Sequence, residues 1–367
     1  MLEPSTTYAF SDTDEFALAT EAKTGSGYVY TRWANPTIDA FEAAVAGLEG
    51  APDAEAFSSG MAAISAVFLS LCSSGDRIVA ARQLYGGSYS VLSHTLPRYG
   101  ITTTFADVSD LDTLAAACRG AKLLYCETIG NPVVEVADLP RLAAIAEDAG
   151  IPLVVDNTFA SPILCRPIEH GATMVVHSAT KFLGGHHDLT GGVLCSSREA
   201  LEPVKELARE LGPTLAPFSA WLALRGLATL HLRVERSSDS ALAVGQALIG
   251  RDDVESVNYP ALEDDAAHEL TAKLLGGRGG GTLGFSVAGG RERAARFQSA
   301  LRLIRPAASL GGTHSLIVHA ATVTHTQLSK EELEAVGISE GFCRLSVGLE
   351  DVDDILDDLE QALERSR

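Results

Sequence analysis

The 367-residue chain lacks several features that would place it in a class at once. Its six cysteines are scattered and form no C-x-x-C pair, which fits small buried thiols in a reducing compartment. The longest mostly apolar run, residues 61–72, is too short to span a bilayer. The first residues include the acidic Glu3, Asp12, Asp14 and Glu15, unlike the basic start of a signal peptide. We therefore expect a soluble, cytoplasmic protein.

Positive charge is also scarce. The 28 Lys and Arg against 48 Asp and Glu give a formal net charge of -20 at pH 7. Nucleic acids and anionic membranes repel such a polyanion, so we expect neither as a partner. The hydrophobic content of 46% is ordinary for a globular protein, and the length suggests two domains.

Motifs of three other chemistries are absent or incomplete. The glycine-rich segment 279–284 fits G-x-G-x-x-G, but a strand pattern follows it where a dinucleotide site needs a helix. His186, His187 and Asp188 are adjacent, and adjacent side chains rarely converge on one ion, so we predict no metal site. The chain has no G-x-S-x-G motif of a serine hydrolase.

Apolar strands alternate with amphipathic helices, which predicts an α/β domain with a mostly parallel sheet that binds ligands beyond its strands' carboxyl ends. We expect an extended N-terminal arm at 1–35, a large domain at 36–228 and a smaller α+β domain at 229–367. The expected strands span 54–58, 77–81, 101–106, 122–127, 152–157, 174–178, 191–196, 254–258, 282–287 and 342–347. The expected helices span 37–49, 61–72, 86–97, 110–118, 138–149, 291–301, 330–336 and 351–364, with a long helical stretch at 216–250 interrupted near Gly226.

Two neighbouring strand ends carry the most specific chemistry. Asp156 ends one apolar run, and Ser178, Thr180 and Lys181 end the next. A lysine amine can form an imine with a carbonyl cofactor, hydroxyls can hold a phosphate, and a carboxylate can hold a protonated ring nitrogen. Taken singly, the lysine could be a solvated surface charge and the aspartate a turn residue. Together, these groups are what pyridoxal phosphate needs.

Three further segments carry suitable chemistry. Ser59, Gly60 and Met61 join a strand to a helix, where backbone N–H groups bind anions, although a plain N-cap serine would look the same. Tyr85 precedes a helix and could stack on a flat ring and exchange a proton, or pack in the core. Arg344 lies in an alternating strand, where an arginine either binds a carboxylate or faces solvent.

In this order the segments resemble the Cys/Met-metabolism family of pyridoxal-phosphate enzymes, which includes methionine γ-lyase, cystathionine γ-lyase, cystathionine γ-synthase and the homoserine-ester sulfhydrylases. The likeness runs from about residue 28 to residue 362. It rests on YTRWANPT at 30–37, SGMAAI at 59–64, VDNT at 155–158, SATK at 178–181 and RLSVGLE at 344–350. It implies a fold-type-I large domain and pyridoxal 5'-phosphate as the cofactor.

The resemblance also implies a role for each matching residue. Lys181 is similar to the Schiff-base lysine and proton shuttle, Asp156 to the partner of the pyridine nitrogen, and Tyr85 to the ring-stacking tyrosine, and these three are the expected catalytic residues. The other expected ligands are Gly60, Met61, Ser178 and Thr180 for the phosphate, Asn131 for the phenolic oxygen, Tyr30 and Arg32 for the phosphate of the neighbouring subunit, and Ser309 and Arg344 for the substrate carboxylate. The implied assembly is a homotetramer with shared sites, and the chain begins close to the family's core, which predicts a shortened arm.

Two departures from the family's patterns bear on the reaction. Ala308 stands where cystathionine-handling members often carry Glu, and Gly87 stands where methionine γ-lyases commonly carry Cys. Residues 337–341 are lyase-like, whereas 212–218 are sulfhydrylase-like. We expect a carbon–sulfur lyase that acts on a sulfur amino acid by γ-elimination through a Lys181 Schiff base. The alternative is γ-replacement, by a homoserine-ester sulfhydrylase or a cystathionine γ-synthase. The competing class is a cofactor-free binding protein, which would not need this whole set of residues.

Overall fold

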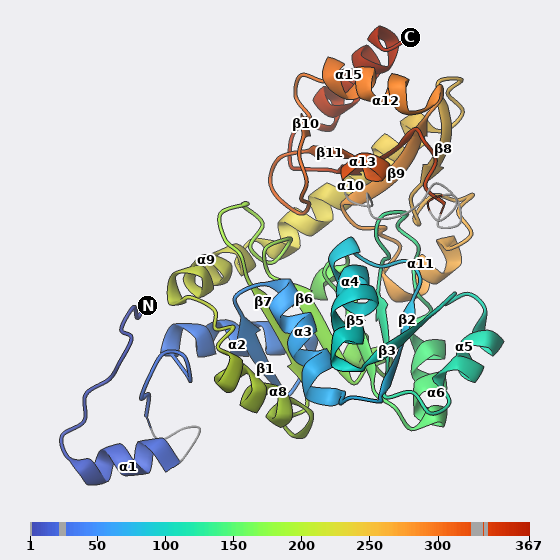
Figure 1. The fold of residues 1–367 in the computed structure, drawn as a ribbon. Coiled ribbons are helices and arrows are strands. Elements are labelled where there is room, and N and C mark those ends of the chain that lie inside the picture. Colours follow the sequence, from blue (N-terminus) through green and yellow to red (C-terminus); the bar gives the residue numbers. More distant parts are fainter. Residues whose placement is uncertain (1, 22–26, 324–332, 334–336) are drawn as a thin grey trace.

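The computed structural model describes residues 2–21, 27–323, 333 and 337–367 (Figure 1). It contains a larger and a smaller sheet, and a hydrophobic core lies against each of them. The N-terminal segment projects from the side of the larger part. The helix predicted at 330–336 lies outside the described residues, except for residue 333.

The larger sheet has seven strands in the order β1-β7-β6-β5-β4-β2-β3. These are β1 (Asp53–Phe57), β2 (Arg77–Ala81), β3 (Thr102–Ala106), β4 (Leu123–Glu127), β5 (Leu153–Asp156), β6 (Met174–Ser178) and β7 (Gly192–Ser196). β6, β5, β4, β2 and β3 pair in parallel, whereas β7 runs antiparallel to both of its neighbours. The predicted α/β fold with a mostly parallel sheet is therefore confirmed. β4 and β5 are buried along their whole length, as expected of strands covered on both faces.

The helices of the larger part are α2 (Pro36–Glu49), α3 (Gly60–Leu71), α4 (Gly86–Ser90), α5 (Leu111–Cys118), α6 (Leu139–Ala149), α7 (Ser161–Leu164), α8 (Arg198–Leu211) and α9 (Pro217–Leu227). The predicted helix at 86–97 changes type along its length. It begins as α4, continues as a π-helical turn (Val91–Thr95) and ends as a 3-10 turn (Leu96–Tyr99). α7 and α8 escape prediction from the sequence, although Leu201 and Val204 of α8 are buried at helical spacing.

The arm at 1–35 is partly helical, which corrects the prediction that it is extended. α1 (Thr13–Glu21) begins after Asp12, whose Oδ1 accepts a hydrogen bond from the Glu15 N–H at 2.8 Å. The N–H and the hydroxyl of Ser11 in turn donate to the Glu15 carboxylate at 3.0 and 2.6 Å. Such reciprocal bonds resemble a capping box, a local signal that outweighs the weak apolar periodicity of the segment.

The smaller sheet has five strands in the order β10-β11-β12-β9-β8. These are β8 (Val254–Asn258), β9 (Thr282–Val287), β10 (Arg305–Pro306), β11 (Leu316–His319) and β12 (Phe342–Ser346). The helices of this part are α10 (Leu230–Leu248), α11 (His268–Leu274), α12 (Gly290–Ala300), α13 (Ala320–Val323) and α15 (Val352–Arg365). β10, β11, α11 and α13 add to the elements that the sequence predicts.

α10 carries the chain from one core into the other. Leu230 at its start packs in the core of the larger part, whereas Ala241 packs in the core of the smaller part. The helical stretch predicted at 216–250 is interrupted as expected, because α9 ends at Leu227 and α10 begins three residues later. The domain boundary between residues 228 and 229 stays a prediction.

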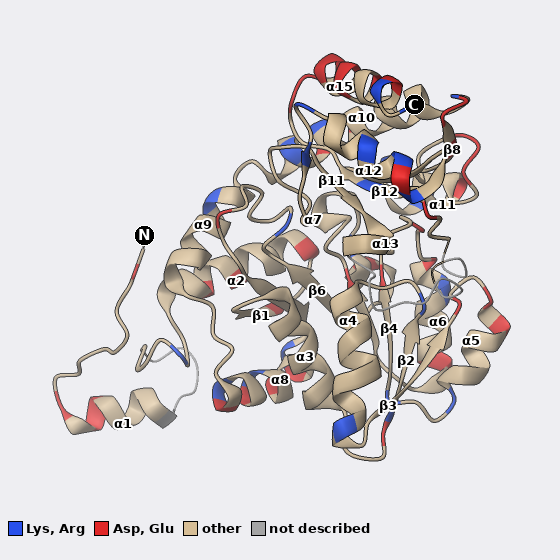
Figure 2. Cartoon of the chain, turned by 45° about the horizontal axis from the view of Figure 1, so that its top comes forward, with Lys and Arg blue, Asp and Glu red and all other residues tan. Residues whose placement is uncertain are grey.

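Charged side chains are most evident on outer helices and loops, and α15 is rich in Asp and Glu (Figure 2). Within the part of the chain that the structure describes, no helix combines the length and the apolar character needed to cross a membrane. All six cysteines are buried and unbridged, which confirms the prediction that they act as small buried hydrophobes.

A buried polar network joins α2 to the back of the sheet. The Glu49 carboxylate lies 2.5 Å from His177 Nε2 on β6, and the Asn157 amide donates to the same carboxylate oxygen at 2.9 Å. The Thr128 hydroxyl donates to the Asn157 Oδ1 at 2.7 Å. All four side chains are buried. Because an unpaired polar group is costly to bury, each of these groups depends on its partners.

His177→Ala should lower the free energy of unfolding by about 3–5 kcal/mol, because it leaves the Glu49 carboxylate buried without its nearest partner. Denaturant unfolding followed by circular dichroism measures the change. Glu169→Ala is the control: Glu169 pairs with Arg166 on the surface, and exposed pairs contribute at most about 1 kcal/mol. Equal losses in the two variants would contradict the prediction.

Candidate active site

The predicted site residues gather where β4, β5 and β6 end. In the strand register Glu127 pairs with Asp156, and Asp156 pairs with Val176, so the three parallel strands end at one edge. Ser178 is the last residue of β6, and the Lys181 N–H donates to the Ser178 carbonyl at 3.1 Å in the turn that follows. Open α/β sheets bind their ligands at this edge.

The Lys181 amine is partly buried and has a partner from a distant segment. Its Nζ donates to the Ser309 Oγ at 3.1 Å. Burial and the nearby Arg344 guanidinium lower the pKa of Lys181 to about 8, because both disfavour the protonated amine. More of the amine is therefore neutral and nucleophilic near neutral pH than in an ordinary lysine.

Asp156 is 8% exposed and has partners on both carboxylate oxygens. Its Oδ1 accepts from the Thr158 N–H at 3.0 Å, and the Tyr125 hydroxyl lies 3.5 Å from Oδ2. Burial raises the pKa of Asp156, and the hydrogen bonds from Thr158 and the charge of His177 oppose that rise. These partners favour the carboxylate, the form that holds a protonated ring nitrogen.

The start of α3 lies against Ser178 and forms an anion site. The Ser59 hydroxyl caps the helix by accepting from the Ala62 N–H at 3.1 Å, and the first amides of a helix have no partner within it. At Gly60 a Cβ would lie 2.7 Å from the Ser178 Cβ and 2.9 Å from its Oγ. A helix start this close to a hydroxyl suits a phosphate. Thr180 lies two residues further on, and its hydroxyl bonds to the backbone of the loop before β7.

Tyr85 lies beside this space with 46% of its surface exposed. A Cβ added at Gly87 would lie 2.5 Å from the Tyr85 Cε1 and 3.0 Å from the Met61 Sδ. Tyr85 and Met61 therefore flank the same space. Any larger residue at position 87 would have to move the tyrosine ring.

Arg344 of β12 reaches into the site from the smaller sheet. It is 4% exposed; its Nη1 donates to the Asn131 Oδ1 at 2.8 Å, and its Nη2 donates to the Ser309 carbonyl at 3.1 Å. Its Nε finds no hydrogen-bond partner among the described residues. Burial lowers the pKa of Arg344 to about 10, and the guanidinium keeps its charge at neutral pH. A buried guanidinium with an unpaired N–H suits a carboxylate ligand.

Tyr30 and Arg32 lie on the arm, apart from the other predicted site residues. The Arg32 guanidinium donates to the Arg209 carbonyl and lies 5.9 Å from the centre of the Tyr30 ring. Among the described residues, the contacts of Arg32 are with the arm, the last turn of α8 and the loop after it, and none joins it to Lys181. One chain alone therefore does not bring these two residues to its own site.

The adjacent histidines have different partners. His186 Nδ1 lies 2.8 Å from the Gly184 carbonyl oxygen, whereas the His187 ring packs against Gly312. In the described ranges of the chain, no three His, Cys, Asp or Glu side chains are grouped so as to hold a metal ion.

Glu127 and Thr158 belong to the site, although the sequence reasoning did not single them out. The Thr158 Oγ1 accepts from the Ser178 N–H at 2.8 Å, and its own N–H donates to Asp156, so it links the phosphate side to the ring-nitrogen side. Glu127 ends β4 as Asp156 ends β5, and the same signal could have found it. Burial and the neighbouring Asp156 raise the pKa of Glu127.

The residues present fit pyridoxal 5'-phosphate. Gly60 and Ser178 form a cradle for an anion, Asp156 supplies a buried carboxylate, and Lys181 supplies an amine of lowered pKa. Arg344 adds a guanidinium whose Nε is unpaired among the described residues. Together, the fold and the site define a pyridoxal-phosphate-dependent enzyme of fold type I.

The chain belongs to the Cys/Met metabolism PLP-dependent enzyme family, whose sequence model matches residues 1–364. This match confirms the predicted family, enzyme class and cofactor. The individual roles of the site residues stay predictions.

Similar proteins carry more than one activity in their names. The chain is 39% identical to the O-acetyl-L-homoserine sulfhydrylase of Leptospira meyeri, covering 99% of this chain and 91% of the relative. It is 42% identical to the cystathionine gamma-lyase of Bacillus subtilis, covering 92% and 89%. A structure from Campylobacter jejuni described as an O-acetylhomoserine (thiol)-lyase, which holds a pyridoxyl-lysine monophosphate, superposes with a TM-score of 0.95 at 34% identity over 99% and 94% of the two chains. Replacement and elimination enzymes are thus about equally similar to this chain.

Gly60→Ala should weaken cofactor binding by about ten- to a hundredfold, because the added methyl displaces Ser178 or the start of α3 from the phosphate. Titration of the cofactor-free protein with pyridoxal phosphate, followed by absorbance, measures the affinity. Gly47→Ala is the matched control, since a Cβ there meets nothing within 4 Å. Unchanged affinity in Gly60→Ala would remove Gly60 from the cradle.

Proposed function

We propose that the protein catalyses γ-elimination on a sulfur amino acid, with pyridoxal phosphate held at Lys181. The observation that carries the proposal is the Lys181 amine of lowered pKa, hydrogen-bonded to Ser309 beside the buried Arg344. The Lys181 amine, which serves as nucleophile and proton carrier, and the Arg344 guanidinium, which can bind a carboxylate, thus both contact Ser309. The Bacillus subtilis relative supports elimination. The Leptospira meyeri relative supports the alternative, γ-replacement by a sulfhydrylase or synthase.

Arg344 and Ser309 orient the substrate in this proposal. The Arg344 guanidinium binds the substrate carboxylate, for which its Nε, unpaired among the described residues, is available. The Asn131 Oδ1 accepts from the Nη1 of the same guanidinium at 2.8 Å and holds it in place. The Ser309 hydroxyl, already a partner of Lys181, keeps the amine next to the bound carboxylate. Because the substrate carboxylate and the Lys181 amine are both held in place, removal of the proton from the α-carbon becomes an intramolecular step.

Lys181 and Asp156 divide the proton chemistry. Pyridoxal phosphate, when bound, supplies an electrophilic aldehyde and a ring that withdraws electrons from the substrate's Cα. Asp156 holds a proton at the ring nitrogen, while Ser178, Thr180 and the first amides of α3 hold the phosphate. Lys181 would hold the aldehyde until the substrate amine takes its place, and the freed neutral amine of Lys181 would then take the proton from Cα.

Lys181 and Tyr85 then control departure of the γ-substituent. After passing the first proton to the bound cofactor, the Lys181 amine would take a second proton, from Cβ. The γ-substituent would then leave with its bonding electrons, and Tyr85 at the edge of the site would protonate the leaving sulfur. Completion with water gives elimination, whereas attack by a thiol gives replacement. The exposed position of Tyr85 leaves either reactant a route to the γ-carbon.

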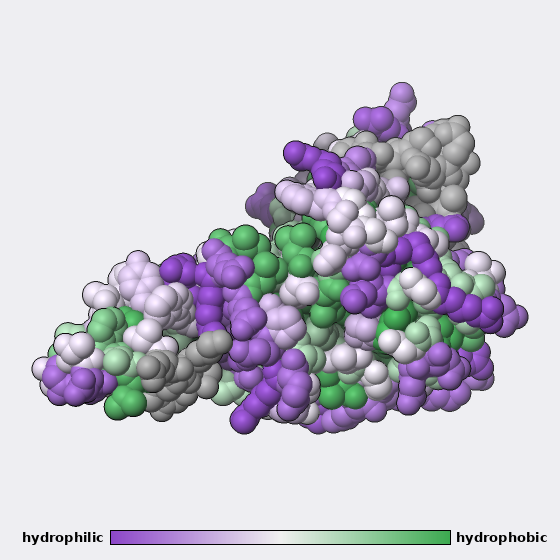
Figure 3. Space-filling view, turned by 60° about the horizontal axis from the view of Figure 1, so that its bottom comes forward, coloured by the Kyte–Doolittle hydropathy of each residue, from purple (hydrophilic) through white to green (hydrophobic). Residues whose placement is uncertain are grey.

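We also propose that two chains complete each site, within a cytoplasmic homotetramer. Figure 3 shows apolar atoms on the projecting arm, where Phe16, Leu18 and Trp33 are exposed. Such surface is typical of an interface. The position of Tyr30 and Arg32 on this arm supports a role in a neighbouring chain's site. The six buried thiols support a reducing compartment.

Incubation of the holoenzyme with methionine, cystathionine, cysteine, and O-acetylhomoserine with sulfide tests the reaction. Elimination should release 2-oxobutanoate and ammonia from methionine or cystathionine without any added thiol. Lys181→Ala should lose about a thousandfold or more of this activity, because it removes the proton carrier. Homocysteine formed from O-acetylhomoserine and sulfide, without turnover of methionine or cystathionine, would establish replacement instead.

Mixing Arg32→Ala with Lys181→Ala subunits tests the shared site. If Arg32 serves its neighbour, a mixed dimer contains one intact site of two. Random re-association should then restore about a quarter of the wild-type turnover, since about half of the dimers are mixed. Each variant re-associated with itself is the control. Mixed dimers that form, as seen by native mass spectrometry, but remain inactive would contradict sharing.

A further inference from the structure

The Glu127 carboxylate joins two segments of the site that carry different predicted functions. Its Oε1 accepts from the Tyr85 N–H at 2.6 Å, and its Oε2 accepts from the Asn131 N–H at 3.1 Å. Glu127 is the last residue of β4 and is 6% exposed. One rigid strand end therefore fixes both the tyrosine segment and the asparagine loop by their backbones.

The connection continues from Asn131 to the catalytic lysine. The Asn131 Oδ1 accepts from the Arg344 Nη1 at 2.8 Å, and the Arg344 Nη2 donates to the Ser309 carbonyl at 3.1 Å. The Ser309 hydroxyl in turn accepts from the Lys181 amine at 3.1 Å. A continuous series of contacts thus runs from the Tyr85 segment through Glu127 to the groups that bind the substrate.

The position is an unfavourable one for a carboxylate. Glu127 lies opposite Asp156 in the strand register, so two carboxyl groups lie side by side in a buried place. An apolar side chain would avoid this repulsion, but it would leave the N–H groups of Tyr85 and Asn131 without their acceptor. An apolar side chain could fill the same space. What Glu127 adds is a carboxylate that holds two backbone N–H groups at a fixed separation.

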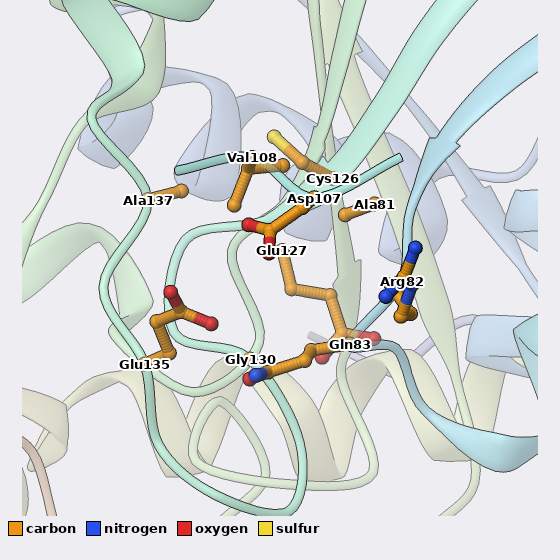
Figure 4. A pocket seen from close by; sticks show the side chains of 10 residues that line it. All are labelled: Ala81, Arg82, Gln83, Asp107, Val108, Cys126, Glu127, Gly130, Glu135 and Ala137. Carbon is orange, nitrogen blue, oxygen red and sulfur yellow. The ribbon is translucent and has the colours of Figure 1, made fainter. Parts of the chain in front are cut away.

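A matched control lies in the same cavity. Glu127 lines a hollow of about 80 Å³ together with Glu135 and Asp107 from neighbouring segments, opposite Arg82 and Gln83 (Figure 4). Among the described residues, no hydrogen bond or ion pair joins the Glu135 side chain to the Tyr85 segment or to Asn131. Glu127 and Glu135 thus place a carboxyl group in the same cavity, but among the described residues only the Glu127 side chain, and not that of Glu135, holds the Tyr85 segment and Asn131.

We propose that Glu127 is a positioning residue that sets the ring of Tyr85 and the Asn131–Arg344 pair relative to each other. Stacking on the cofactor and capture of the substrate carboxylate are then coupled through one side chain. The inference rests on the proposed function of the site and adds a residue that acts through Tyr85 and Arg344 without touching the substrate.

Binding of L-norleucine and of its amide to the Glu127→Gln holoenzyme tests the proposal, with the absorbance of the bound cofactor as the signal. Norleucine has no leaving group, and its amide lacks the carboxylate that Arg344 binds. Gln can accept from one N–H but presents its own NH₂ to the other. Norleucine affinity should fall about tenfold, the amide's affinity should change less than about twofold, and the circular dichroism of the cofactor band should shrink as Tyr85 moves.

Glu135→Gln should leave all three signals unchanged. An equal loss for the two ligands, or equal effects of Glu127→Gln and Glu135→Gln, would overturn the proposal in favour of a general structural or charge effect. Asn131→Ala provides a second measure if Glu127→Gln does not fold. It removes the bond to Arg344 and keeps the backbone N–H from which Glu127 accepts, so it should reproduce the selective loss of norleucine affinity. An equal change in the affinities of norleucine and its amide in that variant would equally overturn the coupling. These signals need no turnover. A wild-type protein that binds no pyridoxal phosphate would instead refute the proposed function.

Discussion

The register of β4, β5 and β6 is the constraint on which the site depends. Because the three strands are parallel and in step, their carboxyl ends bring Glu127 and Asp156 to one place, with Lys181 in the following turn. Successive side chains of a strand point to opposite faces of the sheet, so neighbouring residues at the end of β5 have different roles. Asp156 faces the cofactor side, whereas the next residue, Asn157, contacts Glu49 in the buried network behind the sheet. A slip of one residue would exchange the two faces and abolish both.

The effect of burial on the pKa of each charged group depends on the charges and hydrogen bonds around that group. Lys181 has no acidic partner among the described residues and lies near Arg344, so burial favours its neutral, nucleophilic form. Asp156 receives N–H and hydroxyl groups, which oppose the effect of burial on its carboxylate. Arg344 lies in the smaller sheet and Lys181 beyond the larger one. The proposed substrate site therefore depends on contacts that hold the two sheets together, among them those of α10, Ser309 and Asn131.

Sequence reasoning succeeds here where the signal is local. Strand-end chemistry identifies Lys181 and Asp156, and periodicity finds the strands of the larger sheet. Contacts between distant segments leave no local trace in the sequence. Asn131 and Arg344 are 213 residues apart, and the sequence predicts no contact between them. α1 was missed because its signal is a cap at Asp12 and not apolar periodicity. The place of Arg32 depends on a second chain, which one sequence cannot position.

The burial of all six cysteines has a chemical consequence for an enzyme that handles sulfur. Protein thiols exchange with disulfides, at rates set by access and by the fraction of thiolate. Here burial raises the pKa of Cys126, one residue from Glu127, and raises the pKa of Cys165 to about 12. Neither condition for exchange is met. Disulfides that form when a released thiol is oxidised would therefore find no accessible protein thiolate with which to exchange.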